Sequence, residues 1–180
     1  MIDLKSAEDV SRMRAACAAA ARVLHDLSTL VVPGISTAGL DAAARGLMVR
    51  HGCESACHGY VVGRLSYPGY VCISLNDEVV HGIGSADRIV RDGDLVSLDV
   101  VVRRDGFIGD NARTILVGAV DPRARQLCVD TEKSLQAGIA AALRTDAETS
   151  ALGSLEKTCL TMFIFGVIAW ALNHWGPFVG

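Results

Sequence analysis

The sequence predicts an α+β fold in which two helices precede an antiparallel sheet and flank it. Residues 6–50 carry apolar side chains at helical spacing, whereas residues 59–118 alternate β-branched, aromatic and turn-forming residues. Within the second region Asp105-Gly106 separates two segments rich in β-branched residues, and Asp-Gly is among the strongest short hairpin signals. The expected order is therefore helix, helix and then antiparallel strands.

The composition favours one domain and gives no sign of nucleic-acid binding. The chain has 180 residues, 51% of them hydrophobic, which is enough for one domain with a core. The net charge is -3 and the positive charges are scattered, so we expect no nucleic-acid partner. Six cysteines at irregular spacings, without an N-terminal export signal, favour a reducing cytoplasm over a disulfide framework.

Each of the first two helices has a start signal. Ser6, followed by acidic residues, caps the first helix, and Ser36 or Thr37 caps the second after Pro33-Gly34 interrupts the pattern. The second helix should run through about Arg50 and end at His51-Gly52. The apolar stripe of the first helix comprises Val10, Met13, Cys17, Ala20, Leu24 and Leu27.

Four strands and a third helix are expected after residue 58. The segment 59–76 predicts a strand, a turn at Pro68-Gly69 and a second strand. LVSLDVVVR and FIGDNARTILVG predict the hairpin around Asp105-Gly106. A helix over residues 123–143 should place Leu127, Thr131, Leu135, Gly138, Ile139 and Ala142 on one face.

Two aspartates, Asp99 and Asp110, lie inside the predicted hairpin. With a two-residue loop, Asp99 faces Ala112 and Asp110 becomes its diagonal neighbour on the same face, whereas a three-residue loop would separate them. Two carboxylates this close are unfavourable unless a cation lies between them or one is protonated. The pattern alone leaves open whether they share a metal or whether Asp110 simply faces solvent.

A second group of residues is half of a possible zinc site. Cys53 and Cys57 are four residues apart, and His51 and His58 lie beside them. No second Cys/His pair follows at the spacing of a zinc finger or ribbon, so structural zinc is not expected.

The segment VCISLNDEVVHGIG (71–84), read together with RDGDLVSLDVVVRRDGFIGDNARTILVG (91–118), closely resembles type I methionine aminopeptidases. The likeness extends over roughly residues 3–143. It implies the N-terminal half of the pita-bread fold, in which an antiparallel sheet is flanked by helices. It also implies removal of the N-terminal methionine of peptides or nascent proteins by a water activated between two divalent cations, with Co, Mn, Fe and Zn not distinguished.

The resemblance assigns roles to individual residues. Asp99 and Asp110 match the first two of five metal ligands in that family. His81 matches the histidine that contacts substrate near the scissile peptide and assists proton transfer. Tyr67 and Cys72 match residues that line the pocket for the methionine side chain, where a thiol and an aromatic ring suit a thioether.

Residues 144–180 depart from the family. The resemblance implies three further ligands, a histidine in a Gly-His-Gly-Ile-Gly type motif and two glutamates, and none is recognisable here. We therefore expect a half-domain over residues 1–143, an incomplete fold, and a divergent tail over 144–180. The apolar segment 159–172 is too short to cross a bilayer, so no membrane partner is expected. A buried segment, a membrane-associating tail and a shifted reading frame all stay open for it.

Two functions follow from these patterns. One is a methionine aminopeptidase impaired by the missing ligands. The other is a non-catalytic truncated fragment, or a binding protein of the same fold. Without a second half, the uncovered face of the sheet could also lead to self-association.

A further departure is Val101, where relatives carry a threonine hydroxyl that can bond to a neighbouring ligand.

Overall fold

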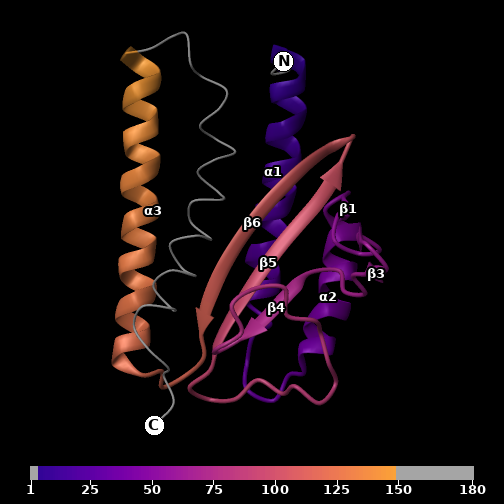
Figure 1. Ribbon diagram of the computed structural model, residues 1–180, viewed down its shortest axis with the longest axis vertical. Helices are drawn as coiled ribbons and strands as arrows, with labels where there is room; N and C mark the ends of the chain where they lie inside the picture. The colour runs from indigo at the N-terminus through magenta and orange to yellow at the C-terminus, as the bar shows by residue number, and fades with distance from the viewer. Residues whose placement is uncertain (1–3, 149–180) are drawn as a thin grey trace. The chain divides into compact units, whose positions relative to one another are not determined.

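The computed structural model describes residues 4–148 (Figure 1). These residues divide into two compact units. The first comprises Ser6–Val120 and contains every strand of the described residues, and the second contains helix α3, Pro122–Glu148. The predicted α+β class with an antiparallel sheet is confirmed by the first unit.

Helices α1 (Ala7–Ser28) and α2 (Thr37–Arg50) begin at the predicted caps, and α2 ends at Arg50 as predicted. The hydroxyl of Ser6 accepts a hydrogen bond from the amide of Asp9, and the Asp9 carboxylate accepts one from the amide of Ser6, which is a complete capping box. At the start of α2, the Ser36 hydroxyl accepts a hydrogen bond from the amide of Gly39 (3.0 Å). Each helix therefore starts where a local side chain satisfies its free amides.

Strand β5 (Leu95–Arg104) is the centre of the sheet (Figure 1). Strand β6 (Phe107–Leu116) pairs along one edge of β5, and the short strands β4 (Cys72–Leu75) and β1 (Glu54–Ser55) share the other edge, all antiparallel. The β5–β6 loop is Asp105-Gly106, with φ of 51° and 81°. Positive φ at both positions is what a two-residue hairpin loop requires, so the predicted hairpin is confirmed.

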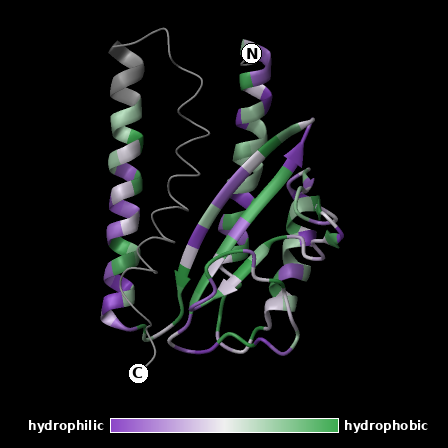
Figure 2. Ribbon diagram, in the orientation of Figure 1, coloured by the Kyte–Doolittle hydropathy of each residue, from purple (hydrophilic) through white to green (hydrophobic). Residues whose placement is uncertain are grey.

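One face of the sheet packs on α1 and α2. Alternate residues of β5 are buried on this side, and Figure 2 shows β5 as a largely hydrophobic strand beside a more polar β6. A Cβ on Gly109 of β6 would lie 2.3 Å from the carbonyl oxygen of Ala16, so only glycine lets α1 approach this closely. The larger core side chains are Val23, Leu27, Leu40, Leu47, Met48, Ile73, Val96, Leu98, Val100 and Val102.

The predicted turn at Pro68-Gly69 is wrong as a hairpin turn. The chain instead reverses at Gly63-Arg64, between β2 (Val61–Val62) and β3 (Leu65–Ser66), which form a separate two-stranded sheet. Gly63 has φ of +62°, a conformation that glycine adopts without steric cost. The single long strand expected before Pro68 is therefore a small hairpin.

The segment after Pro68-Gly69 is held by a helix rather than by a partner strand. The Oδ1 atom of Asp41, on α2, accepts hydrogen bonds from the amides of Tyr70 (2.7 Å) and Val71 (3.1 Å). These bonds direct the chain into β4 along the edge of β5.

Helix α3 confirms the predicted third helix and is longer than the expected 123–143. The carboxylate of Asp121 accepts a hydrogen bond from the amide of Arg123 (2.8 Å) at its start. The predicted face is half-buried, except Ile139, which is 36% exposed. No helix among residues 4–148 is long and apolar enough to cross a membrane. The apolar segment 159–172 lies outside the described residues.

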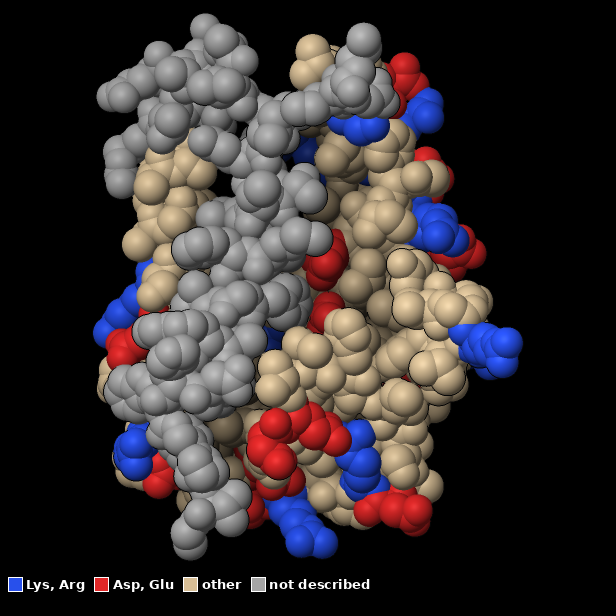
Figure 3. All heavy atoms as spheres, viewed as in Figure 1, with Lys and Arg blue, Asp and Glu red and all other residues tan. Residues whose placement is uncertain are grey.

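Acidic and basic side chains are interspersed over the described residues on the face shown in Figure 3. This distribution agrees with the scattered charges of the sequence.

Candidate functional site

The two aspartates lie on the same face of the sheet, opposite to the face that packs on α1 and α2. Asp99 pairs with Ala112 and Val101 pairs with Asp110, as expected for the two-residue loop. Asp110 is thus the diagonal neighbour of Asp99, a position from which two carboxylates can share a cation. The alternative register, which would separate them, is excluded.

The electrostatics of the pair are unfavourable in the absence of a cation. Burial, reinforced by the nearby Asp110 carboxylate, raises the pKa of Asp99 to about 7. Burial also raises the pKa of Asp110, while its interaction with Asp99 opposes that shift. The Oδ1 atom of Asp99 is buried and has no hydrogen-bond partner among the described residues. A buried oxygen without a partner is costly unless something outside the chain satisfies it.

A divalent cation fits these observations chemically, because carboxylate oxygens are the ligands that such ions prefer. The described part of the chain nevertheless provides few ligands: residues 4–148 contain no cluster of three or more His, Cys, Asp or Glu side chains able to hold a metal. Asp99 and Asp110 therefore form half of a metal site at most.

Two predicted substrate-binding residues lie beside this half-site. Cys72 pairs with Asp99 across β4 and β5. Burial raises the pKa of Tyr67, and the neighbouring Cys72 thiol adds to this shift. The pKa of Cys72 is itself lowered, chiefly by its interaction with the Cys57 thiol and also by Tyr67. Tyr67, Cys57, Cys72 and Asp99 thus form one continuous wall of the sheet face.

His81 is placed by its neighbour, Gly82. The Gly82 carbonyl accepts hydrogen bonds from the amide of Ile73 (2.8 Å) and from the hydroxyl of Tyr67 (2.9 Å). Its amide donates to the hydroxyl of Ser74 (3.1 Å). A Cβ on Gly82 would lie 2.1 Å from the Ile73 carbonyl oxygen, so the loop can approach β4 only with glycine here.

His81 itself is exposed and has a positive φ of 61°, which is uncommon for a residue other than glycine. The hydrogen bonds of Gly82 thus fix the backbone of His81 beside β4, on the edge away from β5. Within residues 4–148 its imidazole makes no hydrogen bond or ion pair with the aspartates.

Sequence reasoning missed two residues that position the site. Cys57 contacts Cys72 although they belong to different segments, and Ser74 anchors the loop that carries His81. Ser74 could have been found from its position, because it is a small polar residue two positions after Cys72 and therefore on the same face of the strand. No local pattern indicated Cys57 as part of this wall.

The possible zinc residues point to different partners. His51 Nε2 pairs with the Asp26 carboxylate at 2.9 Å, and the His58 ring stacks on Tyr70 with 4.4 Å between ring centroids. The Cys53 thiol donates to the Met48 carbonyl at 3.5 Å.

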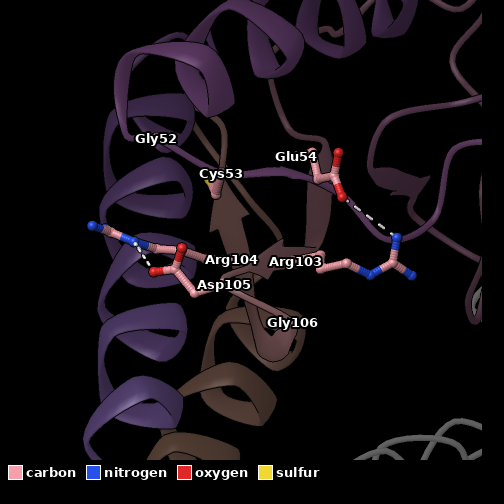
Figure 4. A pocket seen from close by; sticks show the side chains of 7 residues that line it. All are labelled: Gly52, Cys53, Glu54, Arg103, Arg104, Asp105 and Gly106. Carbon is pink, nitrogen blue, oxygen red and sulfur yellow. Dashed lines mark hydrogen bonds and ion pairs between the residues drawn. The ribbon is translucent and has the colours of Figure 1, made fainter.

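A surface pocket of about 340 Å³ lies at the turn end of the β5–β6 hairpin, between Gly52 and Gly106 (Figure 4). Arg103 pairs with Glu54 and Arg104 pairs with Asp105, and Figure 4 shows the two guanidinium groups pointing away from each other. Arg104 is five residues from Asp99, or roughly 16 Å along the strand. The pocket is therefore separate from the half-site. Its two arginine side chains do not point toward a common ligand.

Comparison with known proteins supports one family. Residues 11–166 match the model of metallopeptidase family M24. The chain belongs to this family. It is 36% identical over 172 residues to methionine aminopeptidase B of Synechocystis sp., covering 95% of this chain and 62% of the relative. It is 37% identical over 144 residues to the methionine aminopeptidase of Aquifex aeolicus, covering 79% of this chain and 56% of the relative.

Solved structures of the family confirm the pita-bread fold. Methionine aminopeptidase from Rickettsia prowazekii superposes with a TM-score of 0.71 at 32% identity, covering 77% of this chain and 54% of that one. The enzyme from Thermotoga maritima gives 0.72 at 30% identity, covering the same shares. Xaa-Pro dipeptidase from Bacillus anthracis, at 18% identity and a TM-score of 0.63 over 75% of this chain and 35% of its own, shares the fold.

The chain thus spans 62% and 56% of the length of the two relatives. The family match continues to residue 166, beyond the predicted boundary at residue 143. That boundary, like the divergence of 144–180, stays a prediction.

Proposed function

We propose that this chain provides the first half of the active site of a cytoplasmic methionine aminopeptidase, which acts on the N-terminal methionine of peptides or nascent proteins. One observation carries the proposal: Asp99 and Asp110 converge on one face of the sheet, where an Asp99 oxygen is buried without a partner. Membership of metallopeptidase family M24 supports it.

Each predicted site residue has a role in this proposal. Asp99 and Asp110 hold divalent cations, which when bound lower the pKa of water and polarise the peptide carbonyl. His81, fixed beside β4, hydrogen-bonds the substrate near the scissile peptide and assists proton transfer. Tyr67 and Cys72 contact the thioether of the methionine side chain.

The chain alone should bind metal weakly and turn over slowly. Two carboxylates are too few for a stable catalytic pair of cations, which in proteins takes four or more ligands each. Activity therefore requires ligands from outside the described residues. The same face of the sheet would bind the segment that supplies them, or a second copy of the chain.

A non-catalytic fragment or binding protein of the same fold is the second candidate. The observation that favours it is the absence of a third metal ligand near the aspartates among residues 4–148.

One experiment separates the two candidates. Methionine release from a Met-Ala-Ser peptide is measured in excess Mn²⁺ or Co²⁺, with the doubly substituted Asp99→Asn/Asp110→Asn protein as the control. Metal content is measured on the same samples. Turnover and bound metal that both disappear in the control support the aminopeptidase. Sub-stoichiometric metal and no turnover by the unsubstituted chain eliminate it for this chain and leave the non-catalytic candidate.

A recombinant second half from a relative extends the test. Restored methionine release on mixing, absent with the Asp99→Asn/Asp110→Asn chain, would show that the half-site is competent and only incomplete.

A further inference from the structure

Two thiols meet on the sheet face although they come from different segments. Cys57 follows β1, and Cys72 begins β4. Both segments lie on the same edge of β5: the amide of Ala56 donates to the Val101 carbonyl at 2.9 Å, and Cys72 pairs with Asp99 two residues earlier on β5. The ends of β1 and β4 therefore meet next to each other along β5.

A shared hydroxyl fixes the two segments together. The Ser55 hydroxyl donates to the Tyr70 carbonyl (2.6 Å) and accepts from the amides of Cys57 (3.1 Å) and His58 (3.0 Å). The backbone on both sides is thus joined through one side-chain oxygen. Held in this way, the two thiols are close enough that Cys72 raises the pKa of Cys57 and Cys57 lowers that of Cys72, and neither is in a disulfide.

We propose that Cys57 and Cys72 are an oxidisable pair that forms an intramolecular disulfide when the protein meets a peroxide. Each thiol gives up one hydrogen atom and a sulfur–sulfur bond forms. The peroxide takes up these two hydrogen atoms, which amount to two protons and two electrons, its oxygen–oxygen bond breaks, and two water molecules form. The inference goes beyond the proposed function and does not depend on metal binding.

The bond would fasten the base of an exposed hairpin. The β2–β3 hairpin lies between the two cysteines, and hydrogen bonds cross its base between Tyr60 and Tyr67 (2.8 Å) and between Gly59 and Tyr67 (2.9 Å). Its apolar tip is strongly exposed, with Leu65 78% accessible. A disulfide closing this short loop restricts the hairpin and stabilises the fold. Oxidation therefore changes both the wall beside Asp99 and the mobility of the hairpin.

The test uses the full chain carrying Cys53→Ser, treated with a small molar excess of hydrogen peroxide at neutral pH. Trypsin then releases residues 51–64, in which Cys57 is the only remaining cysteine, and residues 65–88, in which Cys72 is the only one. The expected result is a cross-linked pair of these peptides from the monomeric protein, cleaved by dithiothreitol. Cys57→Ser, added to the same background, should abolish it, whereas Cys17→Ser, which removes an exposed thiol on α1, should not.

Two further readouts accompany the mapping. The oxidised protein should melt about 5 °C or more above the reduced protein, and amides of residues 60–66 should exchange more slowly. Both changes should be absent from the Cys57→Ser protein, whose folding is checked by circular dichroism, with Cys57→Ala as the substitute if the serine variant is unfolded. Oxidation of Cys72 to sulfinic acid without a cross-link, or pairing of either cysteine with a different one, would overturn the proposal.

Discussion

Removing one charge from the aspartate pair should stabilise the metal-free protein. Asp99→Asn keeps the shape of the side chain and removes the ionisable group that burial and Asp110 disfavour. In the unfolded chain an aspartate releases its proton near pH 3.8, whereas folded Asp99 holds it to about pH 7. The difference between these two pKa values sets both the size of the stability change and the pH range in which it occurs.

Between these two pH values the folded state binds more protons than the unfolded state, so the free energy of unfolding falls as pH rises. The loss is complete above pH 7. A shift from 3.8 to about 7 corresponds to an upper limit of roughly 4 kcal/mol at about 1.4 kcal/mol per pKa unit. Asp99 is partly accessible and Asp110 is exposed, so solvent screening reduces this value. We therefore expect Asp99→Asn to be more stable than the unsubstituted protein by about 2–3 kcal/mol at pH 8 and equally stable near pH 4.

The assay is urea unfolding followed by far-UV circular dichroism at several pH values, with a chelator present so that no cation compensates the pair. Asp77→Asn is the matched control, because Asp77 is exposed and the substitution removes the same charge. Asp110→Asn should recover part of the same stability, since it removes the second cause of the shift. Equal pH profiles for Asp99→Asn and Asp77→Asn would refute the reasoning.

Four further substitutions test the scaffold and the half-site. Gly109→Ala should destabilise the fold by about 3 kcal/mol, because its Cβ would lie 2.3 Å from the α1 backbone. Gly46→Ala, in α2 with open space around it, should instead stabilise the fold by about 0.5–1 kcal/mol. The midpoint of urea unfolding measures both effects. Asp41→Ala should cost about 2–3 kcal/mol by the same assay, since two amides lose a charged acceptor. Val101→Thr should tighten Mn²⁺ binding several-fold in calorimetry, because residue 101 pairs with Asp110 and a hydroxyl there can donate to its carboxylate; unchanged affinity would contradict this role.

Features determined by neighbouring residues could be predicted from the sequence. The β5–β6 register follows from Asp105-Gly106, whose two positive φ angles are a local property, and it alone places Asp99 and Asp110 on one face. The starts of α1 and α2 likewise depend on a serine hydroxyl that accepts from an amide three residues later. These predictions needed no knowledge of the tertiary structure.

Features that depend on distant residues were missed. Pro68-Gly69 carries a strong turn signal, but the chain there is directed by Asp41, about thirty residues earlier on α2. The contact between Cys57 and Cys72 likewise depends on Ser55 and on the shared edge of β5. No spacing rule connects residues that meet only through a third segment, which is why the place of Cys57 in the wall beside the aspartates was not predicted.

The direction from which the metal site can be completed follows from the two faces of the sheet. Helices α1 and α2 cover the face that carries Val96, Leu98 and Val100, so no side chain of these helices can reach the aspartates without crossing the core. Further ligands must therefore approach the opposite face. On that face, the side chains of Ser6–Val120 that lie beside the aspartates are Cys57, Cys72 and Tyr67. They do not form a metal-binding cluster of three or more side chains with Asp99 and Asp110. If the pair holds metal as proposed, the remaining ligands have to come from outside this unit and approach the face on which the Asp99 oxygen is buried without a partner.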